Sequence, residues 1–383
     1  MAKVYACRQS AANRSIHVYT NSLVSLLGRG ESENAAVSSR VLVTGGTGFI
    51  AQHCMLTLLE AGYRICTTVR DLARQGEVLA QLRAAGAEPG ERLSFALADL
   101  GSDHGWADAA AGCAYVLHSA SPTPTGTQTS EDDWIRPAVD GNLRVLRAAR
   151  DAGVKRVVLT SAFGAICAGH GDMDRPFDET DWSDLTASDI WPYQKAKTLS
   201  ERAAWEFMAR EGQGLELSVV NPTAVLGPVL GPDYSHSIRL IKHMLEGQPG
   251  CPKINCGFVD VRDVADLHLR AMIHPSAKGE RFLAISGDSL WLSEVAGVLK
   301  ESMGSSARKV NARTLPNWLV RLGAFKDPAL RGSIPLLGRH MNATSEKAKS
   351  VLGWSPRPRE EAIVATAESL IRLGLIKGTE KTA

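Results

Sequence analysis

The chain has 383 residues, 44% of them hydrophobic, and its 43 basic residues nearly balance its 41 acidic residues, which leaves a formal net charge of +2. Interspersed charges with so small a net charge are not typical of nucleic-acid-binding or membrane-surface proteins. No apolar run approaches the ~20 residues of a membrane-spanning helix. The composition therefore indicates a globular protein with a full hydrophobic core.

The first 38 residues precede any strand pattern and show no regular period, so residues 1–38 are predicted to be a disordered N-terminal extension. A targeting segment is the alternative. A short tail is expected at residues 376–383. The seven cysteines are scattered without the spacing of metal ligands, which indicates the reduced thiols of a cytoplasmic protein and predicts no metal site.

A glycine-rich turn links the first predicted strand, residues 41–44, to a helical pattern over residues 49–59. Gly45 permits the tight turn, and Gly48 lets backbone N–H groups approach a pyrophosphate. The small Ala51 lets the helix pack closely on the strand. This arrangement predicts a cradle for a dinucleotide.

The second predicted strand, residues 64–69, is followed by Arg70. Arg70 lies roughly 20 to 25 residues beyond the first glycine, where the adenosine ribose is recognised. An acid there would bind a free 2′-hydroxyl, whereas a cation suits a 2′-phosphate. Arg70 therefore favours NADP(H), with Arg74 as a candidate second cation; the alternative is a solvated surface arginine.

Strand-like and helix-like segments alternate between residues 39 and 226. Such alternation predicts right-handed crossovers and an α/β fold, a Rossmann-type doubly wound parallel sheet that binds its ligand at the carboxyl ends of the strands. Beyond it, residues 227–375 are predicted to form a smaller, mainly substrate-binding region with segments that return to the sheet. The expected strands lie near residues 41–44, 64–69, 92–97, 114–118, 155–160 and 215–220.

Tyr193 and Lys197 are four residues apart on a predicted helix, so both side chains project from one face. A phenol with a pKa of ~10 is a weak acid–base catalyst at neutral pH, and a neighbouring ammonium stabilises the phenolate. Pro192 fits the first turn of the helix, which places the phenol near the positive helix end. The pair predicts a site of proton transfer.

The chain resembles the extended short-chain dehydrogenases/reductases of the NAD-dependent epimerase/dehydratase superfamily. Within them it is most similar to the branch of dihydroflavonol reductases, cinnamoyl-CoA reductases and ketone/aldehyde reductases. The resemblance covers about residues 40–375. It rests on ordered motifs: Thr44-Gly-Gly-Thr-Gly-Phe-Ile50, Val69-Arg-Asp71, Ala98-Asp-Leu100, His118-Ser-Ala-Ser-Pro122, Leu159-Thr-Ser161, Asp178-Glu-Thr-Asp-Trp182, Tyr193 with Lys197, Asn221-Pro-Thr223 and Phe258-Val-Asp-Val-Arg-Asp-Val-Ala265.

The resemblance implies an NADPH-dependent reductase of a ketone or aldehyde, reversible as an alcohol dehydrogenase and either monomeric or homodimeric. Tyr193 would be the general acid, and Lys197 would hold the nicotinamide ribose and lower the tyrosine pKa. Two rival interpretations remain: an NAD-dependent nucleotide-sugar epimerase or dehydratase, and a non-catalytic NADP-binding regulator. The residues expected to bind the cofactor are Gly45, Thr47, Gly48, Phe49, Ile50, Arg70, Asp99, Leu100, Ala120, Ser121, Tyr193, Lys197, Pro222 and Thr223.

One departure from the family concerns the serine that hydrogen-bonds the substrate carbonyl. The family pattern is Thr-Ser-Ser, whereas this chain reads Thr160-Ser161-Ala162, so its serine falls one position early. We predict that Ser161 is catalytic through a local shift. The alternatives are that Thr160, another residue or a water molecule supplies the missing donor.

Overall fold

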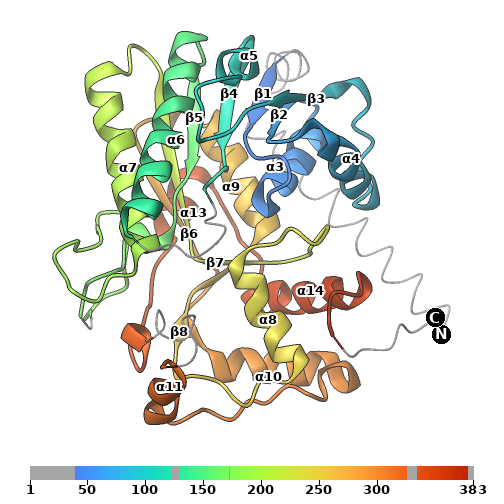
Figure 1. Ribbon diagram of the computed structural model, residues 1–383, viewed down its shortest axis with the longest axis vertical. Helices are drawn as coiled ribbons and strands as arrows, with labels where there is room; N and C mark the ends of the chain where they lie inside the picture. Colours follow the sequence, from blue (N-terminus) through green and yellow to red (C-terminus); the bar gives the residue numbers. More distant parts are fainter. Residues whose placement is uncertain (1–38, 123–129, 172, 326–333, 378–383) are drawn as a thin grey trace.

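The computed structural model describes residues 39–122, 130–171, 173–325 and 334–377 (Figure 1). The predicted extension at residues 1–38, and residues 378–383 of the predicted tail, lie outside these ranges. The described chain is built on a seven-stranded sheet in the order β10-β6-β5-β4-β1-β2-β3. All neighbouring strands are parallel. The strands are β1 Arg40–Val43, β2 Arg64–Val69, β3 Leu93–Leu97, β4 Cys113–His118, β5 Arg156–Thr160, β6 Glu216–Pro222 and β10 Arg281–Ala284.

The sheet confirms the predicted α/β Rossmann-type fold, and the six expected strands lie close to their expected positions. Each is an apolar run because a parallel sheet is covered on both faces. All five residues of β5, for example, are buried. The seventh strand, β10, comes from the C-terminal part of the chain and pairs with β6. The strand order reverses between β1 and β4, which is where ligands bind in such sheets.

Two groups of helices cover the sheet (Figure 1). On one face the apolar side chains of α5, α6 and α7 pack in one core cluster with β4 and β5. On the other face α3, α4 and α9 belong to a second cluster, which continues into the C-terminal part of the chain. These helices are α3 Phe49–Glu60, α4 Gln75–Ala84, α5 Trp106–Ala110, α6 Asp132–Asp151, α7 Pro192–Glu211 and α9 Val261–Ile273.

The C-terminal part of the chain forms a smaller group of elements below the sheet in Figure 1. Its two short strand pairs are β7 with β9 and β8 with β11. The elements are β7 Ala224–Leu226, α8 His236–Glu246, β8 Asn255–Cys256, β9 Phe258–Asp260, β11 Leu290–Trp291, α10 Leu292–Met303, α11 Asn317–Gly323, α13 Glu346–Leu352 and α14 Arg359–Arg372. Short 3₁₀ turns occupy Leu72–Arg74, Gly90–Arg92, Phe163–Ala165, Pro275–Ala277, Gly304–Ala307 and Ile334–Leu336.

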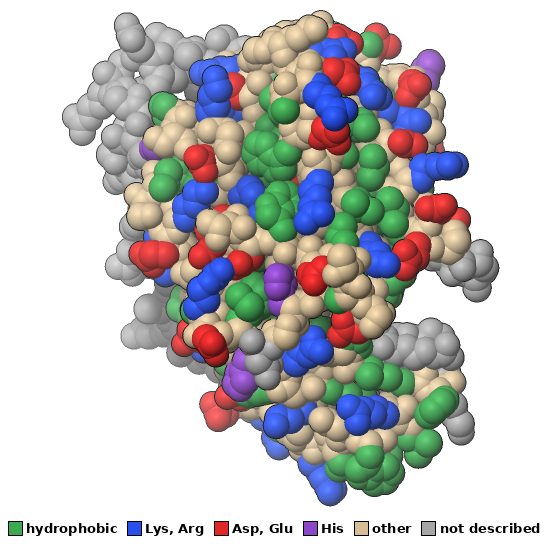
Figure 2. All heavy atoms as spheres, turned by 90° about the vertical axis from the view of Figure 1, so that its left-hand side faces the viewer, with side chains coloured by type: hydrophobic (Ala, Val, Ile, Leu, Met, Phe, Trp, Pro, Cys, Tyr) green, Lys and Arg blue, Asp and Glu red, His purple; other side chains and the backbone are tan. Residues whose placement is uncertain are grey.

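Basic and acidic side chains alternate over the face that carries α6 and α7 (Figure 2). Hydrophobic side chains gather at the lower end of this face, near α11. On that helix Trp318 is 67% exposed and Leu322 is 58% exposed. Within the described ranges, no helix combines the length and apolar character needed to cross a bilayer.

Candidate active site

The turn between β1 and α3 is shaped for close approach of a ligand. Gly45 has a φ of 74°, and a Cβ built on it would lie 3.1 Å from the Cβ of Ala120. The Gly48 N–H donates to the Gly45 carbonyl at 2.8 Å, which closes the turn. Gly48 is also the N-cap residue of α3. No side chain accepts a hydrogen bond from the cap N–H groups of this helix, and its first turn carries no acidic residue. These groups fit the pyrophosphate of a dinucleotide.

A chain of buried hydrogen bonds holds the loop after β4 against this turn. The hydroxyl of Thr44 accepts from the Ala120 N–H at 3.0 Å and donates to His118 Nδ1 at 2.8 Å. His118 Nε2 donates to Asn142 Oδ1 at 3.0 Å because an amide oxygen can only accept, and this makes Nδ1 of the neutral ring the acceptor of the Thr44 hydroxyl. Burial lowers the pKa of His118 to about 4, so the ring is neutral. Asn142 in turn donates to the Ser200 carbonyl at 3.4 Å, which connects the turn to α7.

The two candidate arginines for a 2′-phosphate differ in their surroundings. Arg70 follows β2, is exposed, and makes no ion pair with any residue in the described part of the chain. Arg74 is already paired, at 2.8 Å with Glu77 and at 2.5 Å with Asp233. Arg70 is therefore the available cation at this edge, whereas two carboxylates neutralise Arg74.

The other predicted cofactor residues also follow carboxyl ends of strands. Asp99 and Leu100 follow β3, and Ala120 and Ser121 follow β4. Thr223 follows β6, where its N–H and hydroxyl both donate to the Ala284 carbonyl of β10, at 3.0 and 3.1 Å. The seventh strand thus fixes a predicted cofactor residue.

Tyr193 and Lys197 lie in the first two turns of α7, which begins at Pro192 as expected. Tyr193 is 36% exposed, and Lys197 is half-buried with its Nζ 3.4 Å from the Thr160 carbonyl. Burial lowers the pKa of Lys197 to about 8. The lowering of the Tyr193 pKa by Lys197, which the resemblance implies, stays a prediction.

Both hydroxyls at the end of β5 are engaged inside the protein, on opposite sides of the strand. The Ser161 hydroxyl donates to Glu201 Oε2 of α7 at 2.5 Å. The Thr160 hydroxyl lies 2.7 Å from Nε2 of His268, which belongs to α9. Either hydroxyl would have to leave its partner before it could donate to a substrate carbonyl. The role of Ser161 therefore stays a prediction.

Three residues were not predicted as site residues: Glu201, Arg281 and Asn221, the last of which stands in the motif Asn221-Pro-Thr223. The Glu201 carboxylate is fully buried and accepts from Asn221 Nδ2 at 2.8 Å and from Arg281 Nε at 2.6 Å. The one available signal was that Glu201 stands four residues after Lys197 on the same helix face. Its partners come from strands far away in the sequence.

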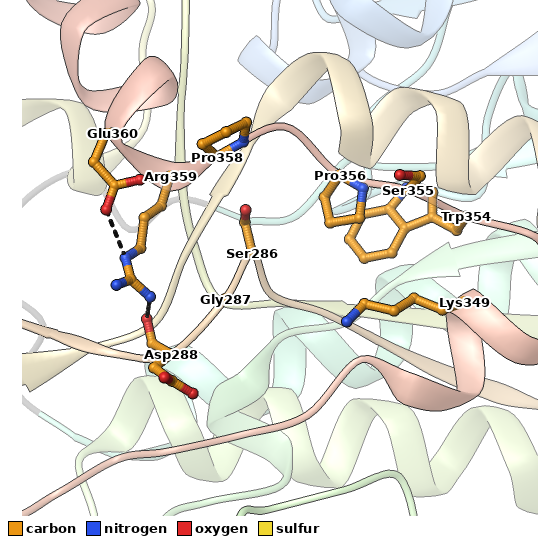
Figure 3. Close-up of a pocket in the computed structure, with 10 residues that line it drawn as sticks. All are labelled: Ser286, Gly287, Asp288, Lys349, Trp354, Ser355, Pro356, Pro358, Arg359 and Glu360. Atoms are coloured by element: carbon orange, nitrogen blue, oxygen red, sulfur yellow. Dashed lines mark hydrogen bonds and ion pairs between the residues drawn. The ribbon is translucent and has the colours of Figure 1, made fainter.

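A surface depression of about 610 Å³ lies where the end of β10 meets the start of α14 (Figure 3). Side chains of both charge signs line it, including Lys349, Arg359 and Glu360. None of the predicted catalytic or cofactor-binding residues lies on its wall. The groups capable of chemistry lie instead at the carboxyl ends of β1, β4 and β5 and in the first turns of α7.

The fold and this site define an oxidoreductase with a nucleotide-binding parallel sheet. The chain belongs to the NAD dependent epimerase/dehydratase family, whose model matches residues 41–284. The predicted family is thereby confirmed.

Several proteins similar to this chain are named reductases. Tetraketide alpha-pyrone reductase 1 of Arabidopsis thaliana is 34% identical over 267 residues, covering 68% of this chain and 80% of that protein. Cinnamoyl-CoA reductase CAD2 of Medicago truncatula is 33% identical over 337 residues, covering 86% and 95%. The crystal structure of yeast methylglyoxal/isovaleraldehyde reductase Gre2 complexed with NADPH has a TM-score of 0.73 at 26% identity, covering 88% of this chain and 99% of that one.

Proposed function

We propose that this protein is an NADPH-dependent reductase of a ketone or aldehyde, which runs in reverse as an alcohol dehydrogenase. The observation that carries the proposal is the position of Tyr193 and Lys197 on α7, next to the end of β5. A hydrogen-bonded chain from Thr44 to Ser200 connects that helix to the glycine turn. Relatives named reductases, and the NADPH complex of Gre2, support it.

The cofactor NADPH would be held by the residues of the strand ends and would supply a hydride to the substrate carbonyl carbon. Gly45 and Gly48 leave room for its pyrophosphate, and Arg70 offers a cation for its 2′-phosphate. Pro222 and Thr223 would border its nicotinamide end. The predicted contacts of Thr47, Phe49, Ile50, Asp99, Leu100, Ala120 and Ser121 belong to the same proposal.

The protonation states of the two catalytic residues suit reduction. Because a phenol has an ordinary pKa of about 10, Tyr193 carries its proton at neutral pH and can give it to a developing alkoxide. Because the pKa of Lys197 is about 8, its amine is mainly protonated at neutral pH. The ammonium can then bind ribose hydroxyls and stabilise the phenolate that remains after proton transfer.

The remaining parts of the proposal concern the substrate side. Residues 227–375 would carry most of the carbonyl pocket, since the strand ends from β1 to β4 are assigned to the cofactor. Ser161 is proposed as the donor to the carbonyl oxygen, with its hydroxyl released from Glu201 when a substrate binds. A monomer or a homodimer is equally compatible with this mechanism.

The variant Tyr193→Phe tests the proposal because it keeps the ring and deletes only the acid. NADPH affinity measured by calorimetry should stay near that of the wild type. Turnover of an accepted carbonyl, found by screening ketones and aldehydes with NADPH, should fall about 10²- to 10⁴-fold. Tyr63→Phe is the matched control, because it removes the hydroxyl of a tyrosine that packs in the core beside α3, and it should be as active as the wild type. A fully active Tyr193→Phe would instead favour the non-catalytic regulator.

A further inference from the structure

A buried carboxylate lies one helical turn beyond Lys197. Glu201 of α7 is fully buried, and its Oε2 accepts from the Ser161 hydroxyl at 2.5 Å and from Asn221 Nδ2 at 2.8 Å. Its Oε1 accepts from Arg281 Nε at 2.6 Å. The donors come from the ends of β5 and β6 and from β10, so one carboxylate joins three neighbouring strands to the catalytic helix.

The cation of this pair is itself enclosed. Arg281 lies 3.9 Å from the centroid of the Trp182 ring, and its Nη1 donates to the carbonyls of Glu179 and Asp181, both at 2.8 Å. Replacing such a buried ion pair with apolar residues is often neutral or stabilising, because desolvation of the two charges offsets their attraction. Stability alone therefore does not explain why these charges lie here.

Lys197 is the nearby group whose ammonium form a negative charge stabilises. Burial lowers its pKa, and the charge of Glu201 is what opposes this lowering. Among the described residues, the neutral His118 from β4 is a second titratable group close enough to interact with Lys197, and Tyr193 stands one turn earlier on the same helix. The Thr160 carbonyl is a further acceptor without net charge. Of these groups, only Glu201 brings a negative charge to the ammonium.

We propose that Glu201 is a positioning residue, which keeps Lys197 in its ammonium form and fixes the ends of β5 and β6 beneath α7. The proposal rests on the proposed function, in which Lys197 acts as a cation. Glu201 is fully buried, so it is expected to act through Lys197 and Ser161 and not by contact with a ligand. Its effect is therefore expected in the pH dependence of the reaction.

The variant Glu201→Gln keeps the size of the side chain and removes its charge. At pH 6.5 its NADPH affinity and its kcat/KM should be closest to those of the wild type. Between pH 6.5 and 8.5 the NADPH affinity and the kcat/KM of the variant should each fall by a factor about five times larger than in the wild type. The reason is that each unit by which the Lys197 pKa falls lowers the ratio of ammonium to amine tenfold. NADPH affinity is measured by calorimetry without substrate, so this readout is independent of turnover.

Three further variants separate this effect from general damage. Glu206→Gln on the exposed side of the same helix should leave the pH profile unchanged. Glu201→Asp retains the charge and should retain the alkaline activity. Glu201→Gln leaves Arg281 as a buried cation without its partner, which is costly. The double variant Glu201→Gln with Arg281→Met removes both charges, and it should show the same alkaline loss if the single variant does not fold.

The outcomes also distinguish this proposal from the proposed function. If a folded Glu201→Gln, or the double variant, follows the wild-type pH profile in both affinity and turnover while Tyr193→Phe is inactive, the role of Glu201 is overturned alone. If Tyr193→Phe is fully active, the proposed function fails first. An alkaline loss that Glu201→Asp reverses supports the proposal.

Discussion

Arg70 is the residue on which the choice between NADPH and NADH should depend. It is exposed at the end of β2 and has no carboxylate partner among the described residues, so its charge is available to a 2′-phosphate. A hydrogen bond to a charged group contributes about 1.5–3 kcal/mol, or one to two decades in affinity. Arg70→Ala should therefore weaken NADPH binding at least about tenfold and leave NADH binding unchanged.

Calorimetry with both cofactors measures this margin. Arg64→Ala, an exposed arginine at the opposite end of the same strand, is the matched control and should bind both cofactors as the wild type does. If wild-type protein bound NADPH and NADH equally well, Arg70 would have no role in cofactor choice, and an NAD-dependent epimerase or dehydratase would gain support.

At the same scale, the sequence indicates Tyr193 and Lys197 because their spacing is local, one turn of one helix. It could not indicate what holds Ser161. The partner of its hydroxyl, Glu201, is 40 residues away, and the cation that pairs with Glu201 is 80 residues further on. Which side of β5 a hydroxyl faces at the end of a strand depends on these tertiary contacts, and a one-residue alignment shift cannot be resolved without them.

At the scale of elements, the turn between β1 and α3 allows a sharp test of the cradle. Gly45→Ala adds a side chain to a residue whose backbone is left-handed. The added Cβ would lie 3.1 Å from the Cβ of Ala120, so the loop after β4 must shift. NADPH affinity should fall at least about tenfold, because both loops border the cofactor in the proposed site. Gly62→Ala has a similar backbone strain, with a φ of 87°, but no atom within 4 Å of the added Cβ.

Gly62→Ala should therefore lose stability like Gly45→Ala and bind NADPH like the wild type. Thermal unfolding and calorimetry on both variants separate strain from steric closure of the site. Equal cofactor affinities in the two variants would show that the turn does not approach the cofactor.

The six strands of the alternating region were predictable because each is a short apolar run followed by a helical period. The strand β10, Arg281–Ala284, was not predicted, because it lies outside the alternating region, whereas the equally short β1 is followed by a glycine turn and a helical pattern. Its place is set by pairing with β6 and by the burial of Arg281 against Glu201. The same holds for β8 and β11, which have two residues each.

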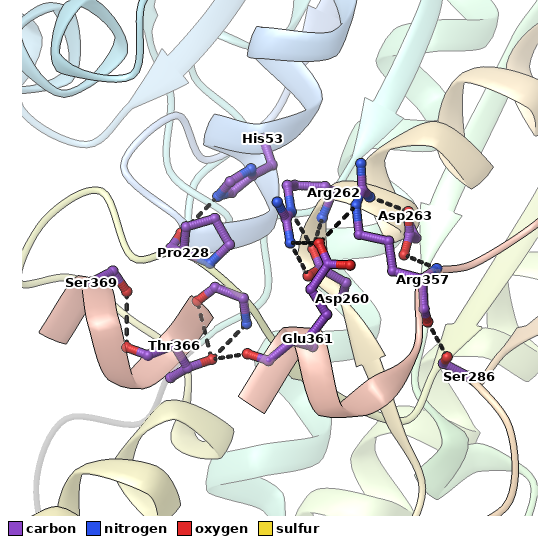
Figure 4. Close-up of polar contacts among 12 residues, drawn as sticks. His53, Pro228, Asp260, Arg262, Asp263, Ser286, Arg357, Glu361, Thr366 and Ser369 are labelled. Atoms are coloured by element: carbon purple, nitrogen blue, oxygen red, sulfur yellow. Dashed lines mark hydrogen bonds and ion pairs between the residues drawn. The ribbon is translucent and has the colours of Figure 1, made fainter. Parts of the chain in front are cut away.

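At the scale of the whole molecule, polar contacts fasten α14 to the elements beside the sheet (Figure 4). The Thr366 hydroxyl accepts from the Gly227 N–H at 2.7 Å, and the Ser369 hydroxyl accepts from the Val229 N–H at 2.8 Å. At the start of α9, Asp263 is bound by Arg357, whose N–H donates to it at 2.7 Å. The C-terminal helix thus stabilises the segment that leaves β7.

His53 of α3 joins the same region, since its Nε2 donates to the Pro228 carbonyl at 3.0 Å (Figure 4). Burial lowers the pKa of His53 to about 4, and it does the same for His118 and His268. In the unfolded chain a histidine takes up a proton near its ordinary pKa of 6.5, while the folded protein does not. Stability from each of these histidines is therefore present above pH 6.5 and is lost as the pH falls toward 4.

The expected loss is about 2 kcal/mol per histidine at pH 5 relative to pH 7. His53→Gln retains an N–H donor for Pro228 but cannot take up a proton, so its free energy of unfolding should fall about 2 kcal/mol less than that of the wild type over this interval. Urea unfolding at pH 7 and pH 5 measures both differences. His104→Gln, at an exposed position, should change by as much as the wild type. If His53→Gln also lost as much stability as the wild type between the two pH values, His53 would have to be protonated in the folded protein, and burial would not be what keeps it neutral.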